Sequence, residues 1–223
     1  MTPSAFEVGT RGPESAAQGT DETGQNRRRE DVGSDYALDI YTAQSIPSAD
    51  FDACFRLIEQ AVANASAYSG MGWSATKKRR EMRLPDMRYL ILRRGQSGDC
   101  GAEVDESARD GRVLGFLSFM VTYEDGKEVN YCYEIHLSPE AQGRGLGRQL
   151  MIRYEDIGRR IGLEKAMLTV SKSNAKAMGF YERLGYVVDD FSPEPRTLRN
   201  GTVKEPEYLI LSKPLKGSAS DGA

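Results

Sequence analysis

The sequence predicts an α/β protein with one mixed, mostly antiparallel sheet, one parallel crossover and helices on both faces. Residues 113–123 and 128–137 have strand-like patterns, and Asp125-Gly126 between them is typical of a hairpin because this pair tolerates positive φ. Closely spaced glycines, an amphipathic helix and a further strand at residues 166–171 come next. Such a crossover pairs its two strands in parallel, with a right-handed connection.

The chain is expected to form one domain with a polar tail at each end. Residues 1–35 hold few large apolar side chains, so they cannot bury enough surface to offset the entropy of ordering and are expected to be disordered. Residues 215–223 form a second polar tail. Residues 36–214 make the domain. No run approaches the roughly 18 apolar residues of a membrane helix, so a membrane-spanning protein is not expected.

Two helices are predicted in the first half of the domain. The first follows Pro47, with Ser48 or Asp50 as its N-terminal cap. Its apolar side chains fall on one face and are Phe51, Phe55, Ile58 and Val62. The second, shorter helix begins after Ser74 and ends before Leu84-Pro85, because proline disfavours helical geometry in the preceding residue.

The remaining elements are strands and two more helices. Residues 88–93 are a predicted strand, and residues 95–111 are a polar insertion. The crossover helix has one apolar face, made of Leu146, Leu150, Tyr154, Ile157 and Ile161. A last helix covers residues 174–184 and ends at Gly185. The last predicted strands are residues 186–188 and 208–211.

The composition argues against nucleic-acid binding, disulfide bonds and a metal site. The 30 Lys and Arg residues against 33 Asp and Glu residues give a formal net charge of -3, which argues against direct nucleic-acid binding. A secretory signal is not visible, so Cys54, Cys100 and Cys132 are expected to be reduced. The only histidine is His136, and this scarcity of ligands argues against a metal site.

The glycine loop is the first motif with chemical content. Gln142-Gly143-Arg144-Gly145-Leu146-Gly147 places bare backbone at the start of the crossover helix. Unpaired N–H groups and the positive end of the helix dipole can hold a pyrophosphate there. The spacing matches neither a nucleoside-triphosphate loop nor a dinucleotide loop, and a tight structural turn is an equally open interpretation of these residues alone.

A second motif at residues 174–186, NAKAMGFYERLGY, follows the crossover. Together with the glycine loop it resembles the GNAT acetyltransferase superfamily, in which acetyl-CoA is the acetyl donor. The resemblance implies that loop amides hold the pyrophosphate and that N–H groups at the end of the preceding strand face the reacting carbonyl oxygen. The implied cofactor-binding residues are Ile135, His136, Leu137, Gln142, Gly143, Arg144, Gly145, Leu146, Gly147 and Asn174.

Several of these residues keep a structural alternative. Asn174 can contact the cofactor, cap its helix, or do both. Tyr181 stands where many GNAT enzymes carry a tyrosine that protonates the leaving thiolate, but an aromatic residue at the edge of the core is an equally open interpretation. The side chain of His136 is expected to be structural.

A narrower resemblance rests on separated blocks in a fixed order: YSGMGW at 68–73, KKRREMRLPDMRYL, YCYE at 131–134, MLTVSKSNAKA, and DDFSP at 189–193. These blocks resemble the NatD-type N-alpha-acetyltransferases, which acetylate the N-terminal serine of histones that begin Ser-Gly-Arg-Gly. The likeness covers residues 48–213. It implies histone tails as partners, a monomer, and a location in nucleus and cytoplasm.

The resemblance makes Glu134 the general base, directly or through water. A peptide N-terminal ammonium has a pKa of about 7.7 to 8.0, so one carboxylate suffices. Partial burial is expected to raise the pKa of Glu134. Strict alternation would put it on the face opposite Tyr131 and Tyr133, so joint action requires a β-bulge or a water relay. A glutamate at the strand edge facing solvent is the alternative.

The substrate site is expected to have aromatic walls and an acidic contact. The candidate substrate-binding residues are Tyr68, Trp73, Tyr131, Tyr133, Tyr208, Asp189 and Asp190, although a core position is commoner for tryptophan. Asp189 and Asp190, or else Glu124 and Asp125, would hold the substrate arginine, because Thr122 takes a position where relatives carry an acidic residue. Met71 also replaces an aromatic residue. Other protein N-termini, lysines or small amines are alternative acceptors, and an inactive CoA-binding module is a further alternative.

Overall fold

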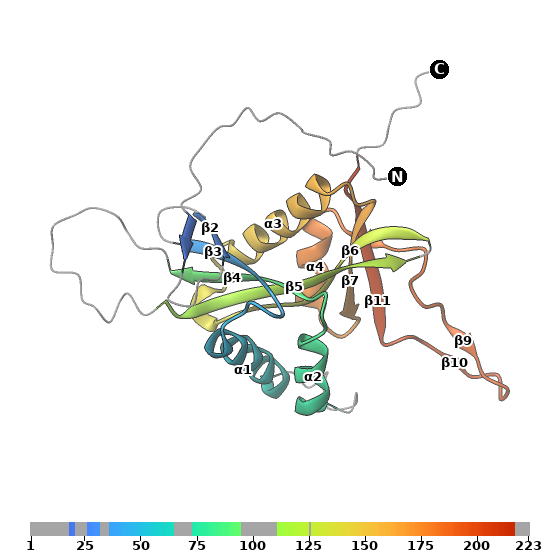
Figure 1. The fold of residues 1–223 in the computed structure, drawn as a ribbon. Helices are drawn as coiled ribbons and strands as arrows, with labels where there is room; N and C mark the ends of the chain where they lie inside the picture. The colour runs from blue at the N-terminus through green and yellow to red at the C-terminus, as the bar shows by residue number, and fades with distance from the viewer. Residues whose placement is uncertain are drawn as a thin grey trace, which may run out of the picture.

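The computed structural model describes residues 18–20, 26–31, 36–64, 73–94, 111–124 and 126–216. Within these residues a nine-stranded sheet runs in the order β1-β2-β3-β4-β5-β6-β7-β11-β8. The β6–β7 pair is parallel and the other pairs of this sheet are antiparallel, which confirms the predicted topology (Figure 1). The strands are β1 Gln18–Thr20, β2 Asn26–Asp31, β3 Tyr36–Thr42, β4 Arg88–Arg94, β5 Val113–Glu124, β6 Lys127–Leu137, β7 Lys165–Ser171, β8 Val187–Val188 and β11 Tyr208–Pro214.

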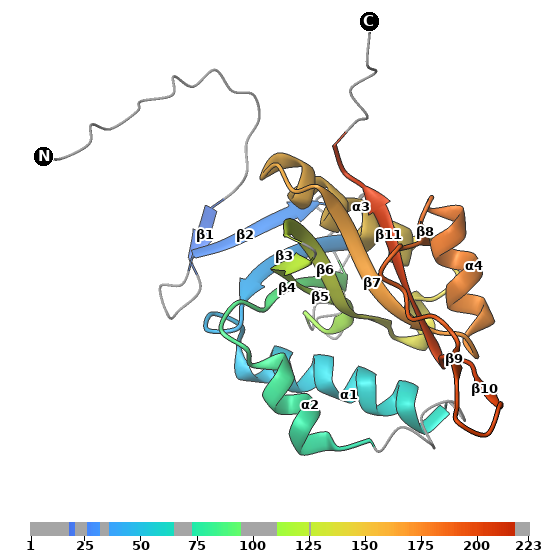
Figure 2. The same ribbon diagram turned by 90° about the vertical axis from the view of Figure 1, so that its right-hand side faces the viewer.

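Helices cover both faces of the sheet, as predicted (Figures 1 and 2). Helices α1 and α2 lie on one face, and α3 and α4 lie on the other. A short 3₁₀ turn, η3, and a two-stranded hairpin, β9–β10, complete the described elements. Their bounds are α1 Ser48–Asn64, α2 Ala75–Met82, η3 Pro139–Ala141, α3 Leu146–Arg160, α4 Ala175–Arg183, β9 Arg196–Thr197 and β10 Val203–Lys204.

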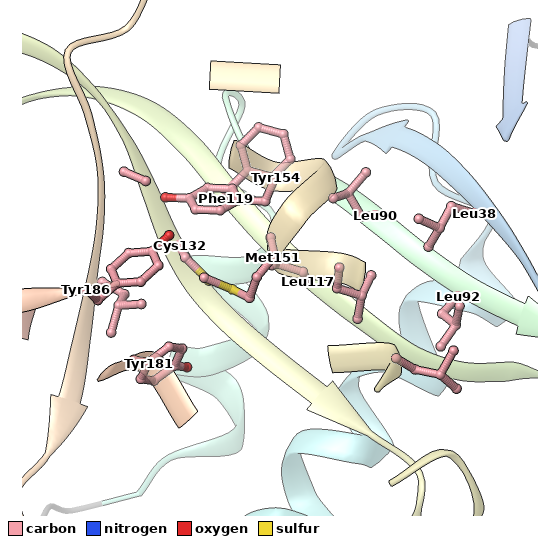
Figure 3. Close-up of a cluster of buried hydrophobic side chains, with 14 of the residues drawn as sticks. Leu38, Leu90, Leu92, Leu117, Phe119, Cys132, Met151, Tyr154, Tyr181 and Tyr186 are labelled. Carbon is pink, nitrogen blue, oxygen red and sulfur yellow. The ribbon is translucent and has the colours of Figure 1, made fainter. Parts of the chain in front are cut away.

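Each face has its own core cluster. Between the sheet and α3 and α4, the aromatic residues Phe119, Tyr154, Tyr181 and Tyr186 pack among leucines (Figure 3). On the other face, the predicted apolar side of α1 packs on Tyr89 and Phe116. Burial of each large side chain contributes about 1.5 to 3 kcal/mol, so both helix layers hold the central strands in place.

An ion-pair network ties α1 to the sheet. Arg93 of β4 donates from Nε to Asp39 Oδ2 at 2.7 Å and from Nη2 to Asp50 in the first turn of α1. Asp39 is fully buried and Arg93 nearly so. Both acidic partners raise the pKa of Arg93 against the opposing effect of burial, so its guanidinium stays charged.

Parts of both predicted tails belong to the folded domain. Gln18–Thr20 and Asn26–Asp31 form strands that extend the sheet beyond β3, because main-chain pairing at a sheet edge needs no apolar side chain. At the other end, Leu215 is buried, and its N–H donates to Glu164 O at 2.9 Å. The ordered chain therefore runs past residue 214. The other residues of 1–35, and residues 217–223, lie outside the described part of the chain.

Two glycines have the backbone conformations that the sequence predicts, whereas α3 is shorter than its predicted apolar face. Gly126 and Gly185 have φ of 71° and 85°, as the turn and helix-end predictions require. Ile161 is 56% exposed instead of buried, because α3 ends before it. The polar insertion at residues 95–110, with Cys100, lies outside the described residues. Among those that are described, every helix is too short or too polar to cross a bilayer.

Candidate active site

A β-bulge in β6 sets the geometry of the candidate site. Ser118 of β5 pairs with Glu134 of β6. The next residue of β5, Phe119, pairs with Cys132, so Tyr133 is an extra residue in β6. A bulge of this kind shifts the alternation of side chains between the two faces of a sheet. This is the bulge that joint action of the YCYE residues requires.

The bulge brings the candidate catalytic residues to one face. Phe116 and Met120 of β5 pack in the core cluster under α1 and α2, and Tyr133 packs against the same cluster. The β6 residues that pair with this face of β5 are Tyr131, Glu134 and His136. Glu134 therefore shares a face with both tyrosines, which strict alternation would have prevented.

Strands β6 and β7 separate beside this face. Their parallel ladder joins Val129–Cys132 to Lys165–Leu168 and ends there. Tyr154 connects the two paired strands, since its hydroxyl contacts the carbonyl of Asn130 in β6 and lies 3.1 Å from Met167 O in β7. The described residues of β7 form no ladder with residues 133–137. The predicted oxyanion donors at Ile135 to Leu137 lie along this opening, and their role remains a prediction.

Both carboxylate oxygens of Glu134 have partners. Lys78 Nζ, from α2, lies 2.8 Å from Oε1, and His136 Nε2 lies 2.6 Å from Oε2. Lys78 also donates to Glu81 Oε1 at 2.6 Å. The side chains of Lys78, Glu134 and His136 are only 19%, 13% and 14% exposed. The glutamate does not face open solvent.

The pKa of Glu134 lies below its ordinary value. Burial raises it, but the hydrogen bond and charge of His136 and the charge of Lys78 outweigh burial. The sequence-based expectation of a raised pKa is therefore wrong. The physical reason is that the contacts of Glu134 with His136, and with Lys78 from a distant helix, outweigh burial, and the sequence interpretation assigned neither contact to Glu134.

Three tyrosines stand on the same face as Glu134. The rings of Tyr131 and Tyr133 lie 5.6 Å apart, and the Tyr131 hydroxyl lies 2.6 Å from Thr169 Oγ1 of β7. Burial raises the pKa of Tyr131 and of Tyr133, so both hydroxyls stay protonated and can donate hydrogen bonds. Tyr208 is 41% exposed and faces the side of Thr169, because its partner Ser171 is two residues further along β7.

The glycine loop fits a pyrophosphate. Gly143 and Gly145 have φ of 73° and 76°, and a Cβ at either position would meet no described atom within 4 Å. Nothing in the described chain accepts a hydrogen bond from the backbone N–H groups of Gly143 to Gly147. Gln142 Nε2 donates to Leu137 O at 3.1 Å, which ties the loop to the end of β6. An open cradle of N–H groups at the start of α3 is suited to phosphate oxygens.

The other loop residues have structural contacts as well. Leu146 is buried and anchors α3. A Cβ on Gly147 would lie 3.5 Å from both Leu137 and Phe180, so this glycine allows close packing. Arg144 Nη1 donates to the hydroxyl of Tyr36 at 3.2 Å.

Three candidates have structural contacts, and their roles toward cofactor or substrate stay predictions. Asn174 Oδ1 accepts from Ala177 N at 3.1 Å and caps α4. Tyr181 is 7% exposed and packs edge-on against the rings of Phe180 and Tyr186, at 5.2 and 6.0 Å. Trp73 stacks on Phe55 of α1 at 6.4 Å. Tyr68, Met71 and Asp125 lie outside the described residues.

Asp189 is not available to hold a substrate arginine. Its Oδ2 lies 2.5 Å from Lys165 Nζ, and its Oδ1 accepts from Phe191 N at 3.1 Å. Burial raises the pKa of Asp189, but Lys165, Ser212 and the Phe191 N–H outweigh burial and hold the pKa below its usual range. The neighbouring Asp190 is exposed.

We expect Asp189→Asn to lower stability rather than acceptor selectivity. The pKa of Asp189 is lower in the folded state, so its ion pair stabilises the fold above the unfolded-state pKa of about 3.9 and is lost as the pH falls through the folded-state pKa. Loss of the pair should cost about 1 to 3 kcal/mol at neutral pH and little in strong acid. Urea unfolding at both pH values measures this, with Asp190→Asn as the exposed control. An equal loss at both pH values would contradict it.

Lys78 is the site residue that the sequence interpretation missed. It lies on the helix KKRREM, and its signal is its position four residues before the buried Met82, which puts both on one helical face. Among the described residues, no three His, Cys, Asp or Glu side chains gather as metal ligands would.

The fold and the loop together define the class of protein. Residues 68–186, more than half of the 223-residue chain, match the Acetyltransferase (GNAT) family. The chain belongs to this family, whose acetyltransferases use acetyl-CoA as acetyl donor. The family match confirms the predicted GNAT fold, and it agrees with the acetyl-CoA cofactor that the resemblance to this superfamily implied.

Two acetyltransferases are similar to part of this chain. Streptothricin acetyltransferase from Streptomyces lavendulae is 30% identical over 129 residues, 54% of this chain and 66% of that protein. Mycothiol acetyltransferase from Rhodococcus opacus is 39% identical over 77 residues, 34% of this chain and 25% of that protein. The chain thus spans less than two thirds of either relative. Neither relative supports the histone specificity implied by the narrower resemblance.

Solved structures support the fold alone. Ribosomal-protein-S18-alanine N-acetyltransferase from Escherichia coli has a TM-score of 0.53 and 18% identity, over 82% of this chain and 97% of that chain. PaiA N-acetyltransferase from Thermoplasma acidophilum, in complex with coenzyme A, has a TM-score of 0.50 and 15% identity, over 79% of this chain and 98% of that chain.

Proposed function

We propose that the protein transfers acetyl from acetyl-CoA to the N-terminal amine of histone tails that begin Ser-Gly-Arg-Gly. The observation that carries this proposal is the β-bulge at Tyr133, which puts Tyr131, Tyr133 and Glu134 on one face beside the opening between β6 and β7. The choice of a histone tail as acceptor rests on the separated sequence blocks that resemble NatD-type enzymes. The proposal includes the nucleus and cytoplasm as location and a monomer as the working form.

The chain's own residues would act in three places. The N–H groups of Gly143 to Gly147 would hold the pyrophosphate, and N–H groups along the end of β6 would stabilise the oxyanion. Acetyl-CoA supplies an activated thioester. Glu134, as a carboxylate at neutral pH, would attract the acceptor ammonium and take up its proton, directly or through water. The Tyr131 and Tyr133 hydroxyls would donate hydrogen bonds beside it and orient the peptide.

Of the acidic pair first expected to hold the substrate arginine, only Asp190 is exposed, and Glu124 of the alternative pair is a second candidate. Asp189 is committed to Lys165. Glu124, at the end of β5, is partly exposed and lies close enough to Tyr131 and Tyr133 to influence the pKa of both. Glu124 is therefore the better candidate for a charge-assisted hydrogen bond to the guanidinium.

A small-molecule amine is the second candidate acceptor. Its support is the similarity of 54% of this chain to streptothricin acetyltransferase. The same carboxylate and the same loop would serve either acceptor, so the difference must lie in the residues around the acceptor.

The test is an acceptor panel with acetyl-CoA. We expect kcat/KM for a Ser-Gly-Arg-Gly peptide to exceed that for Ala- or Met-initiated peptides, and for streptothricin, by about tenfold or more, the ratio that roughly 1.4 kcal/mol of specific contact would give. A peptide with a blocked N-terminus and a free lysine is the negative control. A higher kcat/KM for streptothricin, or an equal rate on the blocked peptide, would refute the histone-tail proposal.

A further inference from the structure

We propose that Lys78 is a positioning residue that keeps Glu134 ionised and oriented toward the acceptor amine. This inference rests on the proposed function in one respect, the assignment of Glu134 as the base. It concerns a residue of α2 to which the sequence resemblance assigned no role.

The contacts define the role. Lys78 Nζ binds Oε1 of Glu134 at 2.8 Å while His136 Nε2 holds Oε2 at 2.6 Å, so the carboxylate is fixed from two sides. His136 is itself fixed, because its ring stacks on Phe116 at 5.7 Å. A carboxylate held in this way has one orientation. It is therefore already aligned when the acceptor amine binds.

Because Lys78 and Glu134 are largely buried, the charge of Lys78 affects the protonation of Glu134. Both side chains of the pair are largely buried, and an uncompensated carboxylate in such a place would bind a proton more readily. Lys78 has a raised pKa, because Glu134 and Glu81 outweigh the effect of burial, so it stays charged through the neutral range. The titratable groups around Glu134 are Lys78 and Glu81 of α2, Tyr89 of β4, and Cys132 and His136 of β6.

None of the other groups can replace Lys78. Burial raises the pKa of Tyr89 and of Cys132, which keeps both neutral. Glu81 has an acidic side chain that contacts Lys78, so it offers no positive charge to Glu134. Among the described residues, His136 would then be the remaining hydrogen-bond partner of the Glu134 carboxylate. Removal of Lys78 should therefore favour the protonated form of Glu134.

The experiment compares Lys78→Met with Lys77→Met, an exposed lysine one position earlier on the same helix. The first readout is the titration of the Glu134 side-chain carboxyl by carbon-13 NMR, assigned by its loss in Glu134→Gln. We expect its midpoint to rise by about 1 to 3 pH units in Lys78→Met and to stay unchanged in Lys77→Met. The second readout is the acidic limb of the kcat/KM profile, which should move in the same direction.

The NMR readout needs no acceptor, so it tests the role of Lys78 even if the peptide is not a substrate. An unchanged midpoint, or an equal fall in kcat/KM at every pH, would overturn the inference. Lys78→Gln keeps a hydrogen-bond donor but loses the charge. It should show the same upward shift, and it replaces Lys78→Met if that variant does not fold.

Discussion

Glu134→Gln should lower kcat/KM by about 10²- to 10⁴-fold, the usual contribution of a positioned general base. Glutamine keeps the shape of the side chain but cannot take up a proton. The loss should be greatest at low pH, where fewer acceptor amines are already neutral. The affinity for acetyl-CoA should be nearly unchanged, because Glu134 contacts Lys78 and His136 and not the glycine loop.

Release of coenzyme A across the neutral pH range, together with calorimetric binding of acetyl-CoA, measures both expectations. Glu128→Gln is the matched control, since Glu128 lies on the same strand but is exposed at its other end. A rate like that of the parent protein, with an unchanged pH profile, would remove Glu134 as the base.

Gly145→Val should weaken acetyl-CoA binding by about ten- to a hundredfold, which corresponds to the loss of one charge-assisted hydrogen bond of roughly 1.5 to 3 kcal/mol. Gly145 has φ of 76°, which a β-branched residue adopts only with strain, so the N–H groups of the loop would turn away from the phosphates. The Kd for acetyl-CoA from calorimetry measures this loss.

Gly162→Val separates cofactor binding from backbone strain. Gly162 has φ of 78° and lies beyond the other end of α3, also with open space at its Cβ. Both variants should lose similar stability, but only Gly145→Val should lose affinity. If Gly162→Val lost as much affinity, the loop would be only a structural turn.

The parts of the fold that depend on local pattern could be predicted from the sequence. The apolar periodicity predicted the buried faces of α1 and α3. The glycines predicted the crossover loop, the hairpin turn and the end of α4. Strand β3 was missed because Asp39 stands in its middle, and acidic residues are rare in strands. Only the fold shows that Asp39 is buried against Arg93.

The need for a bulge at the candidate site could be predicted from the sequence, but the electrostatics of the site could not. The need for a bulge followed from the alternation of YCYE, yet its position at Tyr133 required the register of β5 against β6. The pKa of Glu134 depends on His136 of the same strand and on Lys78, which is 56 residues away in sequence. Likewise, the sequence could not show that Asp189 is paired with Lys165.

The most direct measurement locates the transferred acetyl group. A Ser-Gly-Arg-Gly peptide that also carries a free lysine is incubated with acetyl-CoA and the parent protein, and tandem mass spectrometry finds the modified amine. We expect the acetyl group on the N-terminal amine, with transfer by Glu134→Gln about 10²- to 10⁴-fold slower than by the parent protein. Acetylation of the lysine alone, or transfer to streptothricin with none to the peptide, would contradict the account.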